Sequence, residues 1–277
     1  MTRDFAAGRF LFDRDFQILQ RLLVAEFSPA NFARMNAAIR ETEFSPQSYA
    51  RTGGVLYLII IIAGIFGEFF VRGKLFVPGD ATATAHQIVA SPLLWRVGIC
   101  VDLVMQVCDI PLMVIFYVLL RPVNKHLALL NLLFNLIQTA VLVANKLNLL
   151  MALFVLADAP YLQSIDKNQL YALSYIFIKL HDHGFGIGLI FFGFVCLVEG
   201  YLILRSGYFP KVLGVLMQVA GVCYIANTFT LLLDPQLANQ LFPFILMPCF
   251  IAELALGLWL LVKGVNLEKW KERLRIG

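Results

Sequence analysis

The stretch Gly53–Val71, GGVLYLIIIIAGIFGEFFV, decides the fold class. Apart from Glu68, every residue in it is aliphatic, aromatic or glycine, and it approaches the roughly 20 residues that a helix needs to cross a bilayer. Further apolar stretches follow along the chain, separated by short polar connectors. The six predicted spans cover residues 53–71, 92–120, 126–157, 169–204, 211–233 and 241–263. The sequence therefore predicts an all-α integral membrane protein with six transmembrane helices in an antiparallel bundle.

The composition agrees with this fold class. The chain is 60% hydrophobic and 14% charged, whereas a soluble domain carries roughly a quarter charged residues. Mean hydropathy is +0.79. No basic run is interleaved with aromatic residues, so membrane lipid is an expected partner and nucleic acid is not. The five cysteines are scattered through the apolar stretches without a CxxC motif, which predicts buried thiols rather than a disulfide framework.

Basic residues flank the spans unequally, and this asymmetry predicts the orientation. One side carries Arg51, Arg121, Lys125, Arg205, Lys211, Lys263 and the tail residues Lys269, Lys271, Arg273 and Arg275. The opposite side carries Arg72, Lys74 and Lys167, offset by several aspartates. We therefore expect both termini in the cytoplasm, in a multi-pass protein of the bacterial cytoplasmic (inner) membrane. The charged start of the chain lacks the apolar core of a cleavable signal peptide, so the first span is expected to direct insertion.

The chain divides into three predicted parts. Residues 1–50 contain apolar residues at helical spacing, which predicts an amphipathic helix at the cytoplasmic membrane surface or under the bundle. Residues 51–265 form the transmembrane domain. Residues 266–277 form a short basic tail, with Trp270 expected to anchor at the membrane interface. In the first outer connector, Asp80 is expected to cap a short helix over ATATAHQIVA, which is either a lid or an ordinary re-entry loop.

Charged side chains within a membrane cost several kcal/mol and are candidate functional residues. Counting about 1.5 Å of rise per residue places charged residues of four segments at a similar height in the outer part of the membrane. This predicted outer layer consists of Glu68, Asp102, Lys146, Lys179, His181, Asp182 and His183. It is either an interfacial belt of snorkelling side chains or a ligand-binding pocket open to the extracytoplasmic side. His181 and His183 point about 200° apart on an unbroken helix, so they could share a metal only if the helix breaks at the glycines that follow. No metal site is therefore predicted, and no cofactor is expected.

A second, inner layer is predicted about 12 to 20 Å from the cytoplasmic side. Its members are Asp109, Gln138, Gln218 and Glu253. Asp102, Gln106 and Asp109 share one face of the second span, and Asn131, Asn135, Gln138 and Asn145 share one face of the third. These stripes either form a polar seam that binds a ligand or only hydrogen-bond between helices.

Two further expectations concern the fourth span. Glu199 is expected to pair with Arg205 or Arg121 near the inner interface. Gly184 and Gly188 have the spacing of small residues that permits close helix packing.

Four segments of the chain carry a family resemblance. Residues 50–91, 117–130, 184–216 and 253–265, including GFGIGLIFFGFVCLVEGYLILRSGYFPKVLGVL and ELALGLWLLVKGV, resemble in order and spacing a bacterial membrane family, domain-of-unknown-function family 4386. The resemblance implies six spanning helices over roughly residues 50–266 and no assigned activity. The chain departs from the family at Asn135, where the family often has an arginine, which alters any charge pairing through that position.

Three functions remain open from the sequence. The first is binding or transport of a small molecule or ion through a polar pocket. The second is an integral membrane enzyme acting on a lipid-like substrate, with His183 and Asp182 as an acid–base pair. The third is a structural or regulatory subunit in which the polar groups only fix helix packing. The sequence leaves the catalytic residues unknown, and self-association into a homo-oligomer is also left open.

Overall fold

The structure is a computed structural model, and it describes residues 45–242 and 244–276. The predicted amphipathic helix near the N-terminus lies outside these residues. Within them the regular structure is entirely helical, and six helices are long and apolar enough to cross a membrane. The all-α prediction with six spans is therefore confirmed, and the chain is a multi-pass membrane protein.

The spans begin and end close to the predicted boundaries. The first combines α3 (Pro46–Ile65), the π-helix η1 (Phe66–Arg72) and α4 (Gly73–Leu75), and the next four are α6 (Pro92–Leu120), α7 (Lys125–Phe154), α8 (Lys167–Ser206) and α9 (Lys211–Leu233). The last combines the 3₁₀ turn η3 (Phe244–Leu246) with α11 (Met247–Val262). The connecting and terminal helices are α5 (Ala81–Ala90), η2 (Pro160–Leu162), α10 (Pro235–Leu241) and α12 (Leu267–Ile276).

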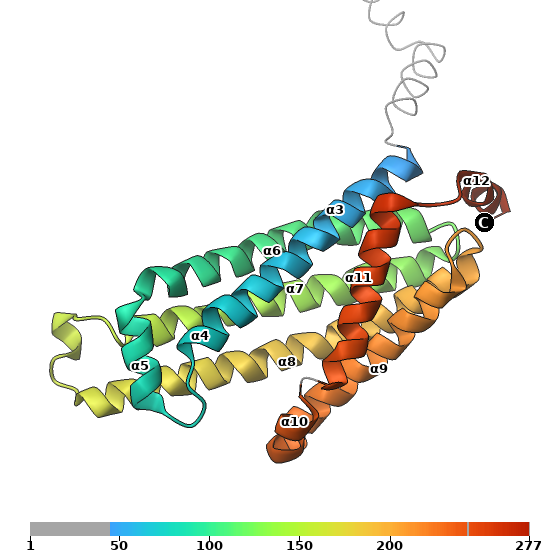
Figure 1. The fold of residues 1–277 in the computed structure, drawn as a ribbon. Coiled ribbons are helices and arrows are strands. Elements are labelled where there is room, and N and C mark those ends of the chain that lie inside the picture. The colour runs from blue at the N-terminus through green and yellow to red at the C-terminus, as the bar shows by residue number, and fades with distance from the viewer. Residues whose placement is uncertain (1–44, 243, 277) are drawn as a thin grey trace, which may run out of the picture. The chain divides into compact units, whose positions relative to one another are not determined.

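The six spans form a closed ring. Each packs against the next in the order α3, α6, α7, α8, α9 and α11, and α11 packs back against α3 (Figure 1). The start of the first span contacts the end of the last through the side chain of Gln47. Its Nε2 donates to the Lys263 carbonyl, and its Oε1 accepts from the Val265 amide. This closure leaves an interior position at which side chains from all six spans converge.

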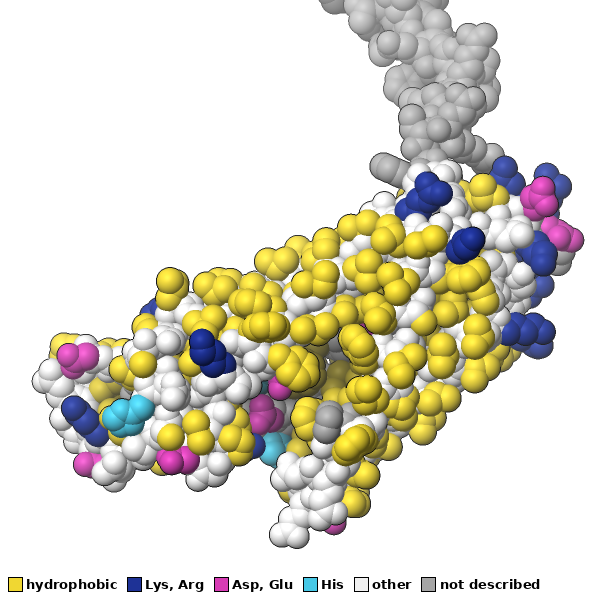
Figure 2. All heavy atoms as spheres, viewed as in Figure 1, with side chains coloured by type: hydrophobic (Ala, Val, Ile, Leu, Met, Phe, Trp, Pro, Cys, Tyr) yellow, Lys and Arg dark blue, Asp and Glu magenta, His cyan; other side chains and the backbone are white. Residues whose placement is uncertain are grey.

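The outer surface of the ring is apolar. Large hydrophobic side chains such as Ile62, Val107, Ile176 and Val222 are exposed, and Figure 2 shows hydrophobic side chains covering the middle of this face. Lys and Arg side chains lie toward its two ends, whereas acidic and histidine side chains also lie beside a hollow in the middle of the face. Exposed apolar surface of this extent matches the hydrocarbon layer of a membrane rather than water.

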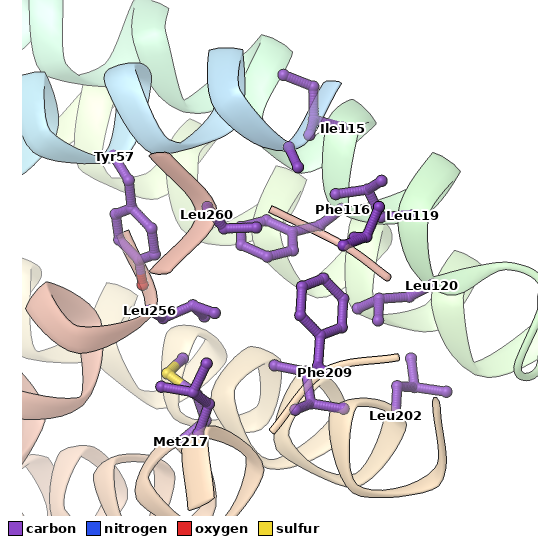
Figure 3. Packing of buried hydrophobic residues seen from close by; sticks show 14 of the residues in the cluster. Tyr57, Ile115, Phe116, Leu119, Leu120, Leu202, Phe209, Met217, Leu256 and Leu260 are labelled. Atoms are coloured by element: carbon purple, nitrogen blue, oxygen red, sulfur yellow. The ribbon is translucent and has the colours of Figure 1, made fainter. Parts of the chain in front are cut away.

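The main hydrophobic core lies toward the end of the ring that carries α12. Phe116, Leu119, Phe209, Met217 and Leu256 pack together there, contributed by α6, α9, α11 and the connector between α8 and α9 (Figure 3). Removing a buried Leu or Phe from such a core costs about 2–5 kcal/mol.

Trp270 belongs to this core. Its side chain is buried, and its indole N–H donates to the Leu119 carbonyl at 3.2 Å. The Tyr208 hydroxyl donates to the same carbonyl at 2.6 Å. The prediction that Trp270 anchors at the membrane interface is wrong, because its ring packs in the protein core and its indole bonds to the Leu119 carbonyl near the end of α6.

Glycines allow α8 to approach its two neighbours. Asn145 and Leu142 of α7 occupy the space beside Gly184 and Gly188, so the predicted close packing there is confirmed. The backbones of α8 and α9 also come close together, because Gly193 lies against Gly221 and Gly200 lies against Gly214. A Cβ at Gly200 would meet the Gly214 carbonyl oxygen at 2.6 Å, and one at Gly221 would meet the Gly193 carbonyl oxygen at 2.6 Å.

The predicted capped helix in the first outer connector is present. Asp80 Oδ1 accepts from the Ala83 amide at 2.8 Å and begins α5. This helix packs against α8, where His86 contacts the Tyr171 ring. The role of α5 as a lid stays a prediction.

Candidate functional site

An ion network that is buried except at Glu68 begins in the π-helical segment of the first span. The wider π turn occurs in residues 66–72, and it keeps Arg72 within the helix rather than in a connector. Arg72 Nε donates to Glu68 Oε2 at 2.9 Å, and Arg72 Nη1 donates to Asp102 Oδ2 at 2.8 Å. Single π-helical turns are rare and occur frequently at functional sites.

The network continues across α6, α7 and α8. Asp102 Oδ2 also accepts from Lys146 Nζ at 2.8 Å, and Lys146 Nζ lies 3.3 Å from His181 Nε2. The other Asp102 oxygen, Oδ1, lies over Gly67, where an added Cβ would approach it to 2.5 Å. Two acids and two bases therefore balance each other, with a histidine at the end of the chain of contacts.

The structure thus brings together four members of the predicted outer layer, Glu68, Asp102, Lys146 and His181, from four segments. Arg72, which joins Glu68 to Asp102, was missed in the sequence because it follows the apolar run and resembles a flanking charge. The i, i+4 spacing of Glu68 and Arg72 is the signal that could have identified it.

The other three members of the predicted outer layer lie on a more exposed side of α8. Lys179 Nζ lies 3.5 Å from Asp182 Oδ2, with both side chains about half exposed. His183 Nδ1 lies 2.9 Å from the Lys179 carbonyl oxygen. Asp182 also approaches His181 Nδ1, at 3.8 Å. The geometry therefore pairs Asp182 with His181 and Lys179 instead of the expected His183.

A cavity of about 130 Å³ lies inside the ring, next to this network along α6. All six spans line it. Its polar lining consists of Tyr57, Gln106, Asp109, Asn135, Gln138, Glu199, Tyr224 and Glu253, and aromatic and aliphatic side chains form the remainder. Figure 2 shows the surface hollowed between α3 and α11, two of the lining helices, with acidic and histidine side chains beside the hollow.

Two of the three carboxyl groups in the cavity have protein donors. Asp109 Oδ2 accepts from the Thr139 hydroxyl at 2.5 Å, and Asp109 Oδ1 lies 3.4 Å from Asn135 Nδ2. Glu253 accepts a hydrogen bond from the Tyr224 hydroxyl. These contacts hold both carboxyl groups in fixed positions at the cavity wall.

The third carboxyl group, Glu199, is differently placed. Its residue is 3% exposed and its Oε1 lacks a hydrogen-bond partner among the described residues. The expected pairing with Arg205 or Arg121 is wrong, because Glu199 faces the ring interior whereas the Arg205 guanidinium stacks on the Tyr201 ring. Height along the helix was a poor guide here, since it does not determine which side of α8 a residue occupies.

Three oxygens at the cavity share this unpaired state. Gln106 Oε1, Asn135 Oδ1 and Glu199 Oε1 are buried without a donor among the described residues, and their residues are 3%, 5% and 3% exposed. All three are hydrogen-bond acceptors. A buried acceptor left without a donor costs about 1–3 kcal/mol, so three such acceptors at one cavity favour a bound donor there.

The predicted inner layer is only partly assembled at the cavity. Asp109, Gln138 and Glu253 line it, whereas Gln218 packs across Gly200 at the contact between α8 and α9. Sequence reasoning missed Glu199 as a cavity residue. It placed Gln106 and Asn135 on the two stripes of the predicted polar seam but in neither predicted layer. The predicted stripe on α6 does follow the site. Asp102 belongs to the ion network, and Gln106 and Asp109 line the cavity.

Metal coordination has little support in this geometry. Helix α8 runs unbroken through His181 and His183, so the two rings leave the helix on different sides. In residues 45–242 and 244–276, no group of three or more His, Cys, Asp or Glu side chains could hold a metal ion.

Comparison with known proteins identifies the family of this chain. A family model described as a domain of unknown function, DUF4386, matches residues 52–264. A protein of Archaeoglobus fulgidus described as uncharacterized is 29% identical over 164 residues, which cover 59% of this chain and 81% of that protein. No solved structure matches the chain. Since the matched residues include all six spans and the cavity that they enclose, this chain belongs to the DUF4386 family of proteins.

Proposed function

We propose that this protein binds a small molecule or ion in the cavity of the six-helix ring, reached from the extracytoplasmic side of the bacterial cytoplasmic membrane. The observation that carries the proposal is the set of three buried acceptor oxygens, on Gln106, Asn135 and Glu199, around one cavity. A protein that used these groups only to hold its helices together would satisfy them with its own donors.

The size of the cavity limits the ligand. About 130 Å³ is close to the roughly 150 Å³ of an engineered cavity that accepts benzene. It is well below the roughly 300–1,000 Å³ of sites for drug-sized molecules. The proposed ligand is therefore a small ion or a molecule of about the size of benzene.

The ion network favours binding over a purely structural role for the polar layers. It stands beside the cavity, since Asp102 and Gln106 are one helical turn apart on α6. Its charges pair with one another and leave the cavity groups uncompensated. The surface is hollowed between α3 and α11, two of the helices that line the cavity (Figure 2).

Cysteine accessibility tests the proposal. Gln138→Cys, in a background with the native cysteines replaced by alanine, places one thiol at the cavity wall. A small membrane-impermeant thiol reagent is then applied to right-side-out and to inside-out vesicles. Leu260→Cys, at a fully buried core position outside the cavity lining, is the matched control.

We expect Gln138→Cys to react at least tenfold faster from the extracytoplasmic side than Leu260→Cys. Reaction from the cytoplasmic side alone would overturn the proposed direction of access. Equal, slow reaction of both thiols from both sides would overturn the accessible cavity and leave the structural role.

A further inference from the structure

We propose that the ligand of this cavity is a small protonated amine whose N–H groups are directed at Gln106, Asn135 and Glu199. This inference rests on the proposed function, because it names the chemical class of ligand for the same cavity.

The unpaired groups determine which kind of ligand fits. All three oxygens accept hydrogen bonds, so the ligand must donate. A primary ammonium group carries three N–H donors and no acceptor, which matches three acceptors around one space. A neutral alcohol offers a single donor, and a fully deprotonated anion offers none.

The charge of the lining points the same way. Three carboxyl groups, Asp109, Glu199 and Glu253, face the cavity, and Lys, Arg and His are absent from its lining among the described residues. An ionised carboxylate inside a membrane protein is costly unless a cation accompanies it. Glu199 lacks such a partner among the described residues, and a bound ammonium would supply it.

The neighbouring bases do not offset this preference. Lys146 and Arg72 both donate to Asp102, and Arg72 also pairs with Glu68. The two positive charges are thereby matched by two negative charges, so the network presents little net field to the cavity. Lys146 and Arg72 therefore do not repel a cationic ligand in the neighbouring cavity.

Aromatic rings complete the recognition of an organic cation. Tyr57, Phe116, Phe185, Phe192 and Tyr224 all line the cavity. A cation over the face of such a ring gains about 0.5–2 kcal/mol. Lys146 already shows this contact, with its ammonium 5.8 Å from the centre of the Phe185 ring. The aliphatic lining residues, such as Met105 and Leu189, would contact the alkyl part of the amine.

A bare metal cation fits this lining less well. Calcium and magnesium take six or more oxygen ligands from carboxylates, carbonyls and water. The cavity instead combines a few acceptor oxygens with five aromatic rings, which cannot complete such an oxygen shell. An alkylammonium ion uses both kinds of lining group.

Calorimetric titration of the full chain in lipid nanodiscs tests the inference with three probes of equal heavy-atom count. These are n-butylammonium, tetramethylammonium, which has the charge without N–H donors, and 1-butanol, which has a donor without the charge. We expect saturable binding of n-butylammonium, at least tenfold weaker binding of tetramethylammonium, and no saturable binding of 1-butanol.

Two variants locate the site. Glu199→Gln is expected to weaken n-butylammonium binding at least tenfold. Asp182→Asn removes a carboxylate outside the cavity lining and is expected to leave the affinity within twofold of the unmodified chain. Thermal unfolding of each variant verifies that it is folded before titration.

The outcomes separate this inference from the proposed function. Binding of 1-butanol as tight as that of n-butylammonium would overturn the amine and retain a cavity that binds small molecules. Sodium displacing n-butylammonium at equal concentration would likewise overturn the amine in favour of an inorganic ion. If Asp182→Asn lowers the affinity as much as Glu199→Gln does, the ligand binds elsewhere. An absence of binding with all probes overturns the amine, and an inert Gln138→Cys would then overturn the proposed function as well.

Discussion

Lys146 Nζ lies 2.8 Å from Asp102 Oδ2, and both side chains are almost completely excluded from solvent, at 3% and 0% exposure. Arg72 contacts the same oxygen. Removing one partner of a buried ion pair leaves an uncompensated charge and typically costs about 3–5 kcal/mol, although the intact pair contributes much less. Asp102 therefore holds together three helices of the ring.

Asp102→Asn is expected to destabilise the folded protein by about 3–5 kcal/mol, because Lys146 and Arg72 would lose their shared counter-charge. The measurement is thermal or denaturant unfolding in detergent. Asp182→Asn breaks the half-exposed pair with Lys179 and is expected to cost less than about 1 kcal/mol.

Adding Lys146→Met to Asp102→Asn should recover part of the loss, since it removes one stranded charge. Similar small losses in Asp102→Asn and Asp182→Asn would show that the network is solvated, contrary to the structure.

Gly200→Ala is expected to lower stability strongly, by several kcal/mol, because the new methyl group would meet the Gly214 carbonyl oxygen at 2.6 Å and force α8 away from α9. Gly64→Ala is the matched control, because its methyl group has only the Met105 sulfur at 3.7 Å and alanine favours the helix. Unfolding temperatures of the two variants make the comparison. A Gly200→Ala protein as stable as Gly64→Ala would contradict the close approach of the two backbones.

The Leu119 carbonyl accepts from both Tyr208 and Trp270, which predicts a non-additive pair of substitutions. Tyr208→Phe leaves the indole donor in place and is expected to cost about 0.5–1.5 kcal/mol. Tyr208→Phe in a Trp270→Phe background should cost more, because the carbonyl then has neither donor. A double-mutant cycle from denaturant unfolding measures the difference, and strict additivity would show that the two donors do not share this acceptor.

Tyr208 also predicts a dependence of stability on alkaline pH. Burial raises the pKa of the Tyr208 phenol above its ordinary value of 10.0. The unfolded chain therefore releases this proton at a pH where the folded protein still holds it, so folding stability falls as the pH rises above about 10. The loss is roughly 1.4 kcal/mol for each pH unit between the two pKa values.

Tyr208→Phe lacks this ionisation and should lose less stability between pH 9 and pH 11 than the unmodified chain. Parallel unfolding temperatures across that range make the comparison. Identical pH profiles would mean that the phenol ionises equally in the folded and unfolded states.

The sequence predicts features that follow from local spacing. The six spans follow from apolar length, the start of α5 from the Asp80 cap, and the meeting of Asp102, Lys146 and His181 from helical rise along three spans. These features depend on one helix at a time, or on heights measured from a common membrane surface.

Features that depend on rotation about a helix axis or on a local departure from α-helical geometry could not be predicted in this way. Arg72 reaches Asp102 because a π-helical turn continues the first span past its apolar run. Glu199 faces the ring interior although its height suggested an interfacial pair. The α8–α9 contact uses two glycines on each helix, seven residues apart. They are Gly193 and Gly200 on α8, and Gly214 and Gly221 on α9. The sequence does not show which glycine of α8 contacts which glycine of α9 until the register between the two helices is known.

The most direct test of the central claim is an experimental density map of the protein with n-butylammonium bound. The account predicts ligand density inside the ring, with its nitrogen within hydrogen-bonding distance of Glu199 Oε1 and of at least one of Gln106 Oε1 and Asn135 Oδ1. A map in which these three oxygens bond to neighbouring side chains and the cavity is filled by Phe185 or Phe192 would contradict it.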